Sequence, residues 1–435
     1  MHSPSNRVVV VGGGIAGLVA ATELERGGRP VLLLEREDTV GGRVRTRRVD
    51  GFRIDRGFQV LFTAYPVLTS YLDLTALELR EFQPAARIAS PTGTSVIGDA
   101  LRDSSVLLET MLSSHIPVSD IWRLLRLRRL ATSLRHEACF APEYAGVSTR
   151  EFLRTRGFTT ATIEHFFAPF YGGILLDRHL ESSAAVLLFT FGMLATGATA
   201  LPARGMAAIP TQLLSRLRLV DVRTSTAVTG VLTEAGRACG VMLSDGTSER
   251  GSDVVLCAEA PAAAVLAASA GVSIPRLPTG RLGSTTIYLA SSTPLLPGRA
   301  LTLNAADHAV ISHAVTVSDV ASEYAPEGQH LLAMTAVGES AQLSDSALER
   351  AAGSELAMMR RSSVSRSMRP VAVERIPYSQ FVHPPGYALD RPSPKTSCPG
   401  LWYGGEGLHS SSLEGAARSG QLVAREVLKT AISHQ

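Results

Sequence analysis

The sequence predicts an α/β protein in which a nucleotide-binding domain is interleaved with a second domain. An apolar run, Val8–Val11, is followed by a glycine-rich turn and a helical pattern, which is the order of a strand, a tight turn and a helix. A second apolar run, Val31–Leu34, ends at the acidic Glu35. Strand patterns return from Leu219 onwards, after a helical stretch over residues 104–167. The chain therefore crosses between the two predicted domains more than once.

Three glycines shape the predicted turn. Gly12 permits the tight turn, Gly14 lets a pyrophosphate approach the backbone, and Gly17 lets the helix and the strand pack closely. The unpaired amides at the N-terminus of the helix then face the anion. The ligand predicted from this segment is a dinucleotide.

The acidic residue after the second strand narrows the choice of dinucleotide. The carboxylate of Glu35 can accept hydrogen bonds from the hydroxyl groups of an adenosine ribose. The same negative charge repels a 2′-phosphate, so NADP is disfavoured. NAD and FAD both remain compatible with this part of the sequence.

Composition supports two globular domains and argues against several classes of function. The chain has 435 residues, of which 45% are hydrophobic, and this suffices for sizeable cores. The net charge is +3 and the arginines are scattered, so we expect no nucleic-acid partner. The four cysteines lack C-x-x-C spacing, which argues against a zinc site or a disulfide framework. No signal-peptide pattern precedes the first strand, and we expect a cytoplasmic protein.

One apolar stretch has the length of a membrane span. Residues 182–203 carry no charge and are rich in leucine and phenylalanine. Gly192, Gly197 and Pro202 interrupt the second half of this stretch, which leaves too few helical residues to cross a bilayer comfortably. We therefore expect a buried helix here.

The remaining elements follow from the periodicity of apolar side chains. The patterns predict a strand over 52–57, several helices over 104–167, strands over 219–222, 228–232 and 253–257, a helix from Ala260, strands over 284–289 and 331–336, a helix over 344–359, a strand over 401–404 and a long helix from Leu413. The helical stretch is thus an insertion within a nucleotide-binding fold.

Further motifs follow the glycine turn in a fixed order. They are V-G-G-R at 40–43, D-R-G at 55–57, P-A-R-G-M-A-A-I-P at 202–210, Val228, and Y-G-G-E at 403–406 with L-E-G-A at 413–416 and S-G at 419–420. With the glycine turn and Glu35, they resemble the motifs of the flavin-containing amine oxidase, phytoene desaturase and protoporphyrinogen oxidase superfamily. The resemblance extends from the N-terminus to the last predicted helix.

This resemblance implies a fold and a cofactor. The fold is an FAD-binding Rossmann-like domain of the glutathione-reductase type, over residues 1–62, 204–272 and 399–435, interleaved with an α+β substrate domain over 63–203 and 273–398. The cofactor is FAD, since a plain NAD dehydrogenase does not call for the V-G-G-R segment. The residues implied in FAD binding are Gly12, Gly14, Ile15, Ala16, Gly17, Glu35, Arg36, Gly41, Gly42, Arg43, Gly57, Phe58, Gln59, Val60, Val228, Gly405, Glu406, Ser412, Leu413 and Ala416.

Two of these positions have specific roles in the resemblance. Glu406 stands where the superfamily often has aspartate, and its carboxylate can accept from a ribityl hydroxyl. The helix that begins near Ser412 can point backbone amides towards the pyrimidine edge of the flavin and stabilise its reduced anion.

The resemblance to the amine-oxidase branch is incomplete. That branch commonly has a lysine from the substrate domain near the flavin and a tyrosine just before the position of Leu413. Here the two lysines are Lys395 and Lys429, and Ser412 stands at the tyrosine position. Both departures argue against an ordinary amine oxidase.

Candidate catalytic residues are those that the resemblance places beside the flavin or the substrate cavity. They are His409, Tyr378, Tyr171 and Gln59, with His383 as a further candidate. His409 can titrate near neutral pH and donate to a substrate, or it can be structural. Tyr171 lies in an aromatic-rich segment, where packing is the alternative role. His383 precedes two prolines, and we expect it to serve a rigid loop.

The stretch 121–130 combines arginines with an imperfect apolar stripe. Trp122, Leu125 and Arg129 fall near one side of the predicted helix. We expect this helix to cap the substrate domain. Transient contact with a membrane surface, from which a lipid substrate would enter, is the alternative.

The function expected is that of an FAD-dependent oxidoreductase that removes hydride from a hydrophobic small molecule to flavin N5. The net reaction would be that of a desaturase, a dehydrogenase or an oxidase, with oxygen or another electron acceptor. Amine oxidation is one alternative. A second is isomerisation of a polyene by reduced FAD without net oxidation. A third is a flavoprotein whose FAD is structural and whose surface serves a partner.

Overall fold

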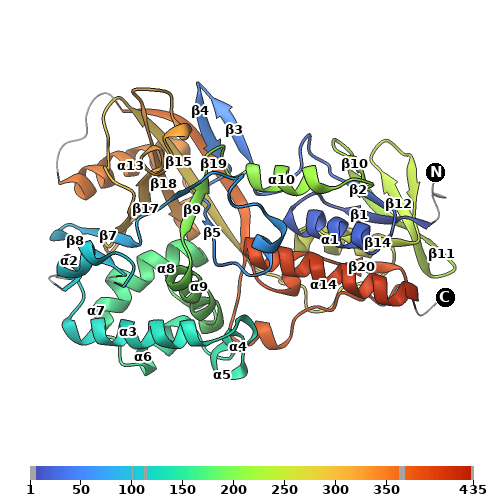
Figure 1. The fold of residues 1–435 in the computed structure, drawn as a ribbon, viewed down its shortest axis with the longest axis horizontal. Coiled ribbons are helices and arrows are strands. Elements are labelled where there is room, and N and C mark those ends of the chain that lie inside the picture. The colour runs from blue at the N-terminus through green and yellow to red at the C-terminus, as the bar shows by residue number, and fades with distance from the viewer. Residues whose placement is uncertain (1–5, 100, 112, 114, 362–367, 433–435) are drawn as a thin grey trace.

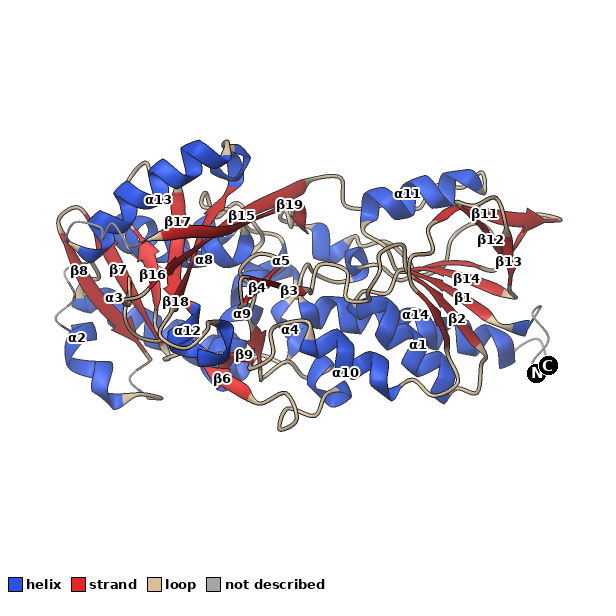
Figure 2. Ribbon diagram, turned by 90° about the horizontal axis from the view of Figure 1, so that it is seen from above, coloured by secondary structure: helices blue, strands red, loops and turns tan. Residues whose placement is uncertain are grey.

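Five short strands form a parallel sheet at one end of the elongated molecule (Figures 1 and 2). The computed structural model describes residues 6–99, 101–111, 113, 115–361 and 368–432. The strand order is β10-β2-β1-β14-β20, and all neighbouring pairs are parallel. The strands are β1 (Val8–Val11), β2 (Val31–Leu34), β10 (Asp221–Arg223), β14 (Asp253–Leu256) and β20 (Leu401–Tyr403). Every residue of β1, β2 and β14 is buried, because other elements cover both faces.

The alternating valines of β1 face two different layers. Val8 and Val10 belong to the core that includes α1 (Ile15–Arg26) and α14 (Leu413–Ile432), which pack against each other. Val9 and Val11 face the opposite layer. That layer comprises the antiparallel strands β11 (Val228–Glu234), β12 (Arg237–Leu243) and β13 (Ser248–Arg250), with α11 (Ala260–Ser269). An apolar side chain is therefore required at every position of β1.

A seven-stranded mixed sheet forms the other end of the molecule (Figure 2). Its order is β19-β15-β18-β17-β16-β7-β8, and β16 with β7 is its parallel pair. The strands are β7 (Ala85–Ser90), β8 (Gly93–Gly98), β15 (Arg281–Ser291), β16 (Leu301–Asn304), β17 (Ile311–Thr316), β18 (His330–Val337) and β19 (Arg369–Phe381). One face is covered by α13 (Asp345–Arg360), which contributes Leu348, Ala352 and Leu356 to the core between them.

A helical layer lies beneath this sheet in the view of Figure 1. Its central helix, α9 (Ala184–Thr196), is the buried helix expected within 182–203, and α3, α4, α5 and α6 pack against it. The bounds are α2 (Leu107–Met111), α3 (Val118–Ser133), α4 (His136–Cys139), α5 (Pro142–Ala145), α6 (Thr149–Thr155), α7 (Thr160–Thr162), the π-helix η4 (Ile163–Phe167) and α8 (Ala168–Leu175). Within the described residues, no helix combines the length and the apolarity that crossing a bilayer requires.

Small elements connect the two ends. They are the hairpin β3 (Thr46–Val49) and β4 (Phe52–Asp55), the sheet of β5 (Leu61–Phe62), β9 (Thr199–Pro202) and β6 (Leu79–Glu81), the helices α10 (Ala208–Arg216) and α12 (Val317–Val320), and the 3-10 helices η2 (Leu68–Tyr71), η3 (Ser104–Val106), η5 (Ser322–Tyr324), η6 (Gly338–Gln342), η7 (Tyr387–Leu389) and η8 (Glu406–Leu408). They bring segments distant in sequence together in the middle of the molecule.

The buried carboxylate of Asp55 joins three of these segments. It accepts hydrogen bonds from the Met206 amide at 3.0 Å, from the Tyr324 hydroxyl at 2.7 Å and from the Thr46 hydroxyl. Burial raises the pKa of Asp55 to about 6, while its three donors favour the ionised form. Asp55 therefore anchors both the chain returning from α9 and the segment before β18 to the end of β4.

The structure has the α/β architecture that the sequence predicts, but it contains more strands than were predicted, and two of the differences have a clear physical reason. The longest strand, β19, was not predicted because it contains two prolines, which normally exclude a central strand. It is an edge strand of the large sheet, where an amide donor can be missing. The hairpin β7–β8 was not predicted either, because its small side chains alternate weakly. The exact domain boundaries stay a prediction.

We predict that Asp55→Ala lowers the free energy of unfolding by about 2–4 kcal/mol, because one buried amide and two hydroxyl groups lose their acceptor. Asp55→Asn keeps an acceptor oxygen of the same size and should lose less. Urea unfolding of both variants near pH 7 measures the difference. Equal losses in the two variants would contradict the role of the hydrogen bonds.

Candidate active site

A large cavity of about 1010 Å³ lies between the parallel sheet and the large sheet, among the described residues. Its lining includes the β1–α1 turn, the segment after β2, the start of α14, and residues of α8, α9 and β19. Ligands of open parallel sheets bind beyond the carboxyl ends of the strands, and this cavity has that position. It is the candidate active site.

The glycine turn at one end of the cavity is shaped by close backbone contacts. Gly12 has φ +104°, and a Cβ there would lie 2.7 Å from the carbonyl oxygen of Cys257. A Cβ on Gly17 would lie 1.9 Å from the carbonyl oxygen of Gly12, so α1 can start this close to β1 only with glycine. A Cβ on Gly14 would meet no protein atom within 4 Å. Gly14 therefore borders open space, as a residue beside a diphosphate must.

Glu35 is held in a fixed position at the same end of the cavity. Its carboxylate accepts hydrogen bonds from the Gly13 amide at 2.7 Å and from the Glu37 amide at 3.0 Å. The side chain is buried and lines the cavity. Because a carboxylate can accept about four hydrogen bonds, both oxygens keep capacity for the hydroxyl groups of a ribose.

A second helix N-terminus opens into the cavity beside the first. α14 begins at Leu413, and the Ser412 hydroxyl accepts a hydrogen bond from the Gly415 amide at 2.9 Å. A Cβ on Gly420 would lie 2.2 Å from the carbonyl oxygen of Ala16, so α14 packs directly on the first turn of α1. Two positive helix ends therefore converge on one cavity, which suits a ligand with a diphosphate.

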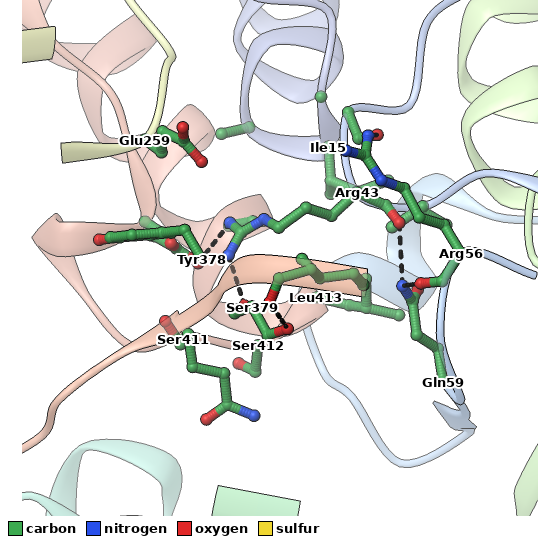
Figure 3. A pocket seen from close by; sticks show the side chains of 18 of the residues that line it. Ile15, Arg43, Arg56, Gln59, Glu259, Tyr378, Ser379, Ser411, Ser412 and Leu413 are labelled. Atoms are coloured by element: carbon green, nitrogen blue, oxygen red, sulfur yellow. Dashed lines mark hydrogen bonds and ion pairs between the residues drawn. The ribbon is translucent and has the colours of Figure 1, made fainter. Parts of the chain in front are cut away.

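An ion pair joins the N-terminal and C-terminal segments across the cavity (Figure 3). Arg43 lies 2.7 Å from Glu406 between the guanidinium and carboxylate atoms, and it donates to the carbonyl oxygen of Ser379 at 2.6 Å. Glu406 is buried, and its second oxygen, Oε1, has no hydrogen-bond partner among the described residues. A buried carboxylate oxygen without a donor is costly, and a ribityl hydroxyl would supply that donor.

The residues present fit FAD. The open space at Gly14, the two helix ends, the carboxylate of Glu35 and the free oxygen of Glu406 are all features that a bound flavin dinucleotide would use. Of the residues implied in FAD binding by the sequence, all but Gly17 and Gly405 line the cavity. Gly17 and Gly405 instead permit close backbone contacts, the latter with the carbonyl oxygen of Ala258.

The two candidate catalytic residues that line the cavity differ in their contacts. The Gln59 amide nitrogen donates to the carbonyl oxygens of Arg43 and Arg56, each at 2.9 Å, and so holds the backbone of this loop (Figure 3). The Tyr378 ring lies beside Arg43, with 5.8 Å between the guanidinium carbon and the ring centroid. Burial raises the pKa of Tyr378, so its hydroxyl stays protonated. Their catalytic roles stay a prediction.

The other two candidates, Tyr171 and His409, lie outside the cavity lining. Tyr171 is fully buried, and its ring stacks on Phe191 with 6.3 Å between centroids. His409 turns its Nε2 atom to Nε2 of His136, 2.9 Å away, and burial lowers the pKa of His409 well below 6.5. Neither side chain lines the cavity in which a substrate would lie, and the catalytic roles of both residues stay a prediction.

His383 has the structural role expected for it. It is buried, and its Nε2 atom accepts a hydrogen bond from the amide of Ser411, which lines the cavity. Burial and the positive charge of Arg391 lower the pKa of His383 to about 3. The neutral imidazole thus fixes the backbone just before α14.

His313 on β17 is a cavity residue that the sequence did not reveal. Its side chain is only 4% exposed, its ring centroid lies 5.3 Å from that of Phe58, and neither ring nitrogen has a partner among the described residues. Burial lowers the pKa of His313 to about 4, so the imidazole is neutral. A single histidine in an apolar strand carries no sequence signal. His313 becomes a candidate only in the folded protein, where it lies beside Phe58 and lines the cavity.

The segment 57–65, α8, α9 and the large sheet provide the wall opposite the glycine turn, which we call the substrate wall. It is largely apolar and includes Phe58, Phe62, Phe170, Ile174, Val186 and Phe189. Its neutral polar members include Thr190, His313 and Gln380, and its charged member among the described residues is the exposed Arg281. The four carboxylates that line the cavity, Glu35, Glu37, Glu259 and Glu406, come from outside this wall.

We predict that alanine at positions 14 and 17 separates FAD binding from folding. Gly14→Ala adds a methyl group that meets no protein atom within 4 Å, so the melting temperature of the FAD-free protein should be kept while FAD affinity falls roughly tenfold or more. Gly17→Ala forces α1 away from β1 and should lower the melting temperature. Flavin absorbance per protein and thermal unfolding measure the two effects. Full flavin content in Gly14→Ala would contradict the inference that the diphosphate of FAD lies against Gly14.

We predict that stability falls as the pH drops below about 6.5, because His313 and His383 stay neutral in the folded protein and take up protons when unfolded. Each histidine should lower the free energy of unfolding by about 1.4 kcal/mol per pH unit in the window between its folded pKa and 6.5. Asp55, with its raised pKa, acts in the opposite direction. His383→Gln, whose amide oxygen can still accept from Ser411, should reduce the slope. Urea unfolding over the range from about pH 7 to pH 5 tests this, and an unchanged slope would refute it.

The comparison of this chain with known proteins agrees with a flavin-binding site. The model of the flavin-containing amine oxidoreductase family matches residues 15–428. A phytoene dehydrogenase of Streptomyces griseus is 53% identical over 61 residues, which are 14% of this chain and 12% of that protein. An L-amino-acid oxidase of Sistrurus catenatus edwardsii is 41% identical over 80 residues, 18% of this chain and 16% of that protein. The chain thus matches only a small part of the length of these relatives.

The fold is shared with solved structures over nearly the whole chain. A protein of Exiguobacterium sp. 255-15, assigned as a protoporphyrinogen oxidase, superposes with a TM-score of 0.74 at 19% identity and covers 98% of this chain and 99% of its own. The predicted fold class is thereby confirmed. The family match confirms the predicted FAD cofactor and the expectation of a flavin-dependent oxidoreductase. The chain belongs to the family of flavin-containing amine oxidoreductases.

Proposed function

We propose that this protein oxidises a neutral, hydrophobic small molecule by removing hydride equivalents from it. The observation that carries the proposal is the substrate wall, which is largely apolar and contributes no carboxylate among the described lining residues. A buried cationic substrate would need a counter-charge there, since an unpaired charge is costly to desolvate. A neutral, apolar molecule needs none.

The lysines and the α14 segment argue against ordinary amine oxidation. Neither lysine lines the cavity: Lys395 lies 3.9 Å from Glu426, and Lys429 lies 2.7 Å from the same carboxylate. Ser412, at the position of the tyrosine common in the amine-oxidase branch, caps α14. The chain therefore lacks both groups that would assist an amine in that branch.

The protein's own part in this reaction is to exclude water and to fix positions. Bound FAD supplies the acceptor of the hydride. The aromatic and aliphatic side chains of the substrate wall remove water from the substrate and hold it by shape. His313, neutral because its pKa is about 4, offers one donor and one acceptor to a polar group of the substrate. The amides at the start of α14 favour negative charge developing nearby.

We predict that anaerobic mixing with neutral polyisoprenoids bleaches the flavin absorbance, whereas primary and secondary amines do not. Mass spectrometry of the product should show loss of two hydrogens. Bleaching by amines, with aldehyde or imine products, would refute the proposal. Turnover that leaves the mass of a polyene unchanged would replace it by isomerisation.

A matched pair of substitutions tests the substrate wall itself. Thr190 lies on α9, is buried, and bonds the Val186 carbonyl oxygen at 2.7 Å. Thr190→Val keeps the size and should retain most activity, whereas Thr190→Asp adds a buried carboxylate and should lower kcat/KM for a neutral substrate roughly 100-fold. Flavin content, measured by absorbance, should not change in either variant. Equal activity of the two variants would contradict a neutral substrate site.

A further inference from the structure

The helix α3 has two apolar faces, and the protein covers only one of them. Leu127 and Ala131 are buried in the core beneath the helix. Val118, Trp122 and Leu125 lie on another face and are exposed, with Trp122 at 66%. Their spacing of four and three residues places them in one row along the helix. Packing against the interior of the molecule therefore explains one apolar face of α3 and leaves the other unexplained.

Further exposed hydrophobic side chains lie on and before α2, at the same end of the molecule as α3. Leu101 lies before α2, and Leu108 and Met111 lie on it; all three are exposed. We call Leu101, Leu108, Met111, Val118, Trp122 and Leu125 the α2–α3 patch. It holds six of the eleven large hydrophobic side chains that are exposed among the described residues. Both ribbon views place α2 and α3 at the same end of the molecule, opposite the chain termini (Figures 1 and 2).

Positive charge borders the patch. Arg126 and Arg129 are exposed on α3 next to the row, and neither forms an ion pair with the described residues. Asp120, the acidic residue in the first turn of α3, is buried and bonded to Arg123 and Thr159, so it does not offset this charge. Glu109 is the exposed carboxylate of α2. The chemistry is that of an interfacial helix, with a tryptophan and aliphatic side chains flanked by arginines.

The helix α3, which carries part of the patch, packs against a helix that lines the cavity. α3 packs on α9, whose residues Val186, Phe189 and Thr190 line the substrate wall. Arg128 of α3 reinforces this contact by donating to the carbonyl oxygen of Ala195 on α9 at 3.2 Å. Arg102, which precedes α2, donates to the carbonyl oxygen of Leu194 on α9 at 2.8 Å. The surface that carries the patch and the wall of the cavity are therefore opposite sides of one packed pair of helices.

We propose that the α2–α3 patch docks this protein on the surface of an anionic membrane. Trp122 and Leu125 enter the boundary between headgroups and acyl chains, and Arg126 and Arg129 contact lipid phosphates. The charge of the flanking arginines selects anionic lipid over a neutral bilayer, and the single row of apolar side chains gives reversible attachment without a spanning helix. This proposal does not depend on which substrate the cavity takes.

The test is co-sedimentation of the full-length, FAD-loaded protein with vesicles of phosphatidylcholine, with and without phosphatidylglycerol. We expect binding to the anionic vesicles, weaker binding to the neutral ones, and release by added salt. The double variant Trp122→Ser and Leu125→Ser should weaken binding roughly tenfold or more. Leu219→Ser and Leu422→Ser, at exposed positions outside the patch, should bind as the wild type does.

Tryptophan fluorescence reports on the contact directly. The chain has two tryptophans, and Trp402 is 4% exposed with its indole bonded to Asp253. A blue shift on adding anionic vesicles therefore reports Trp122 entering the interface. Arg126→Gln with Arg129→Gln should abolish the preference for anionic lipid while flavin content and melting temperature stay unchanged.

Three results would overturn the proposal. They are failure to sediment with anionic vesicles, equal binding by the Trp122→Ser and Leu125→Ser variant, and a concentration-dependent dimer that this variant abolishes. The last result, measured by light scattering, would show that a second copy of the chain covers the patch.

Discussion

The arrangement of the cavity depends on close contact between two helices that begin far apart in the sequence. α1 starts against β1 because Gly17 has no side chain, and α14 lies on the first turn of α1 because Gly420 has none. With any side chain at these positions the helices must separate. Two positive helix ends would then no longer point into the same space. The glycines therefore determine where a diphosphate can bind, although Gly17 itself does not line the cavity.

Charge is distributed unevenly around this cavity. The carboxylates of Glu35 and Glu406 and the guanidinium of Arg43 are held by short contacts with the segments around the glycine turn and α14. The substrate wall contributes aromatic and aliphatic side chains with neutral hydroxyl, amide and imidazole groups, and its charged member among the described residues is the exposed Arg281. Ionic groups can therefore fix a dinucleotide without creating a charged site for the substrate. This division supports binding of an uncharged molecule next to a highly charged cofactor.

The dinucleotide end of the site could be predicted from the sequence because its geometry is set by residues that are close together in the chain. A strand, a turn and a helix within Val8–Arg26 fix the positions of Gly12, Gly14 and Gly17 relative to one another. The substrate wall could not be predicted in the same way, because α8, α9, β17 and β19 meet only in the folded molecule. His409 illustrates the limit. Its place near Glu406 in the chain suggested a role at the flavin, but the turn at η8 points its imidazole to His136.

His313 shows how the shape of the substrate wall depends on a residue with no side chain. A Cβ on Gly173 of α8 would lie 2.7 Å from Nδ1 of His313, so glycine at this position lets the imidazole stand at the wall. Neither ring nitrogen of the buried imidazole has a hydrogen-bond partner among the described residues. This arrangement lowers the stability of the fold unless a bound molecule forms the missing hydrogen bonds. A polar atom on an otherwise apolar substrate would do so. A neutral substrate with one polar atom would therefore suit both the apolar side chains of this wall and the unpaired imidazole of His313.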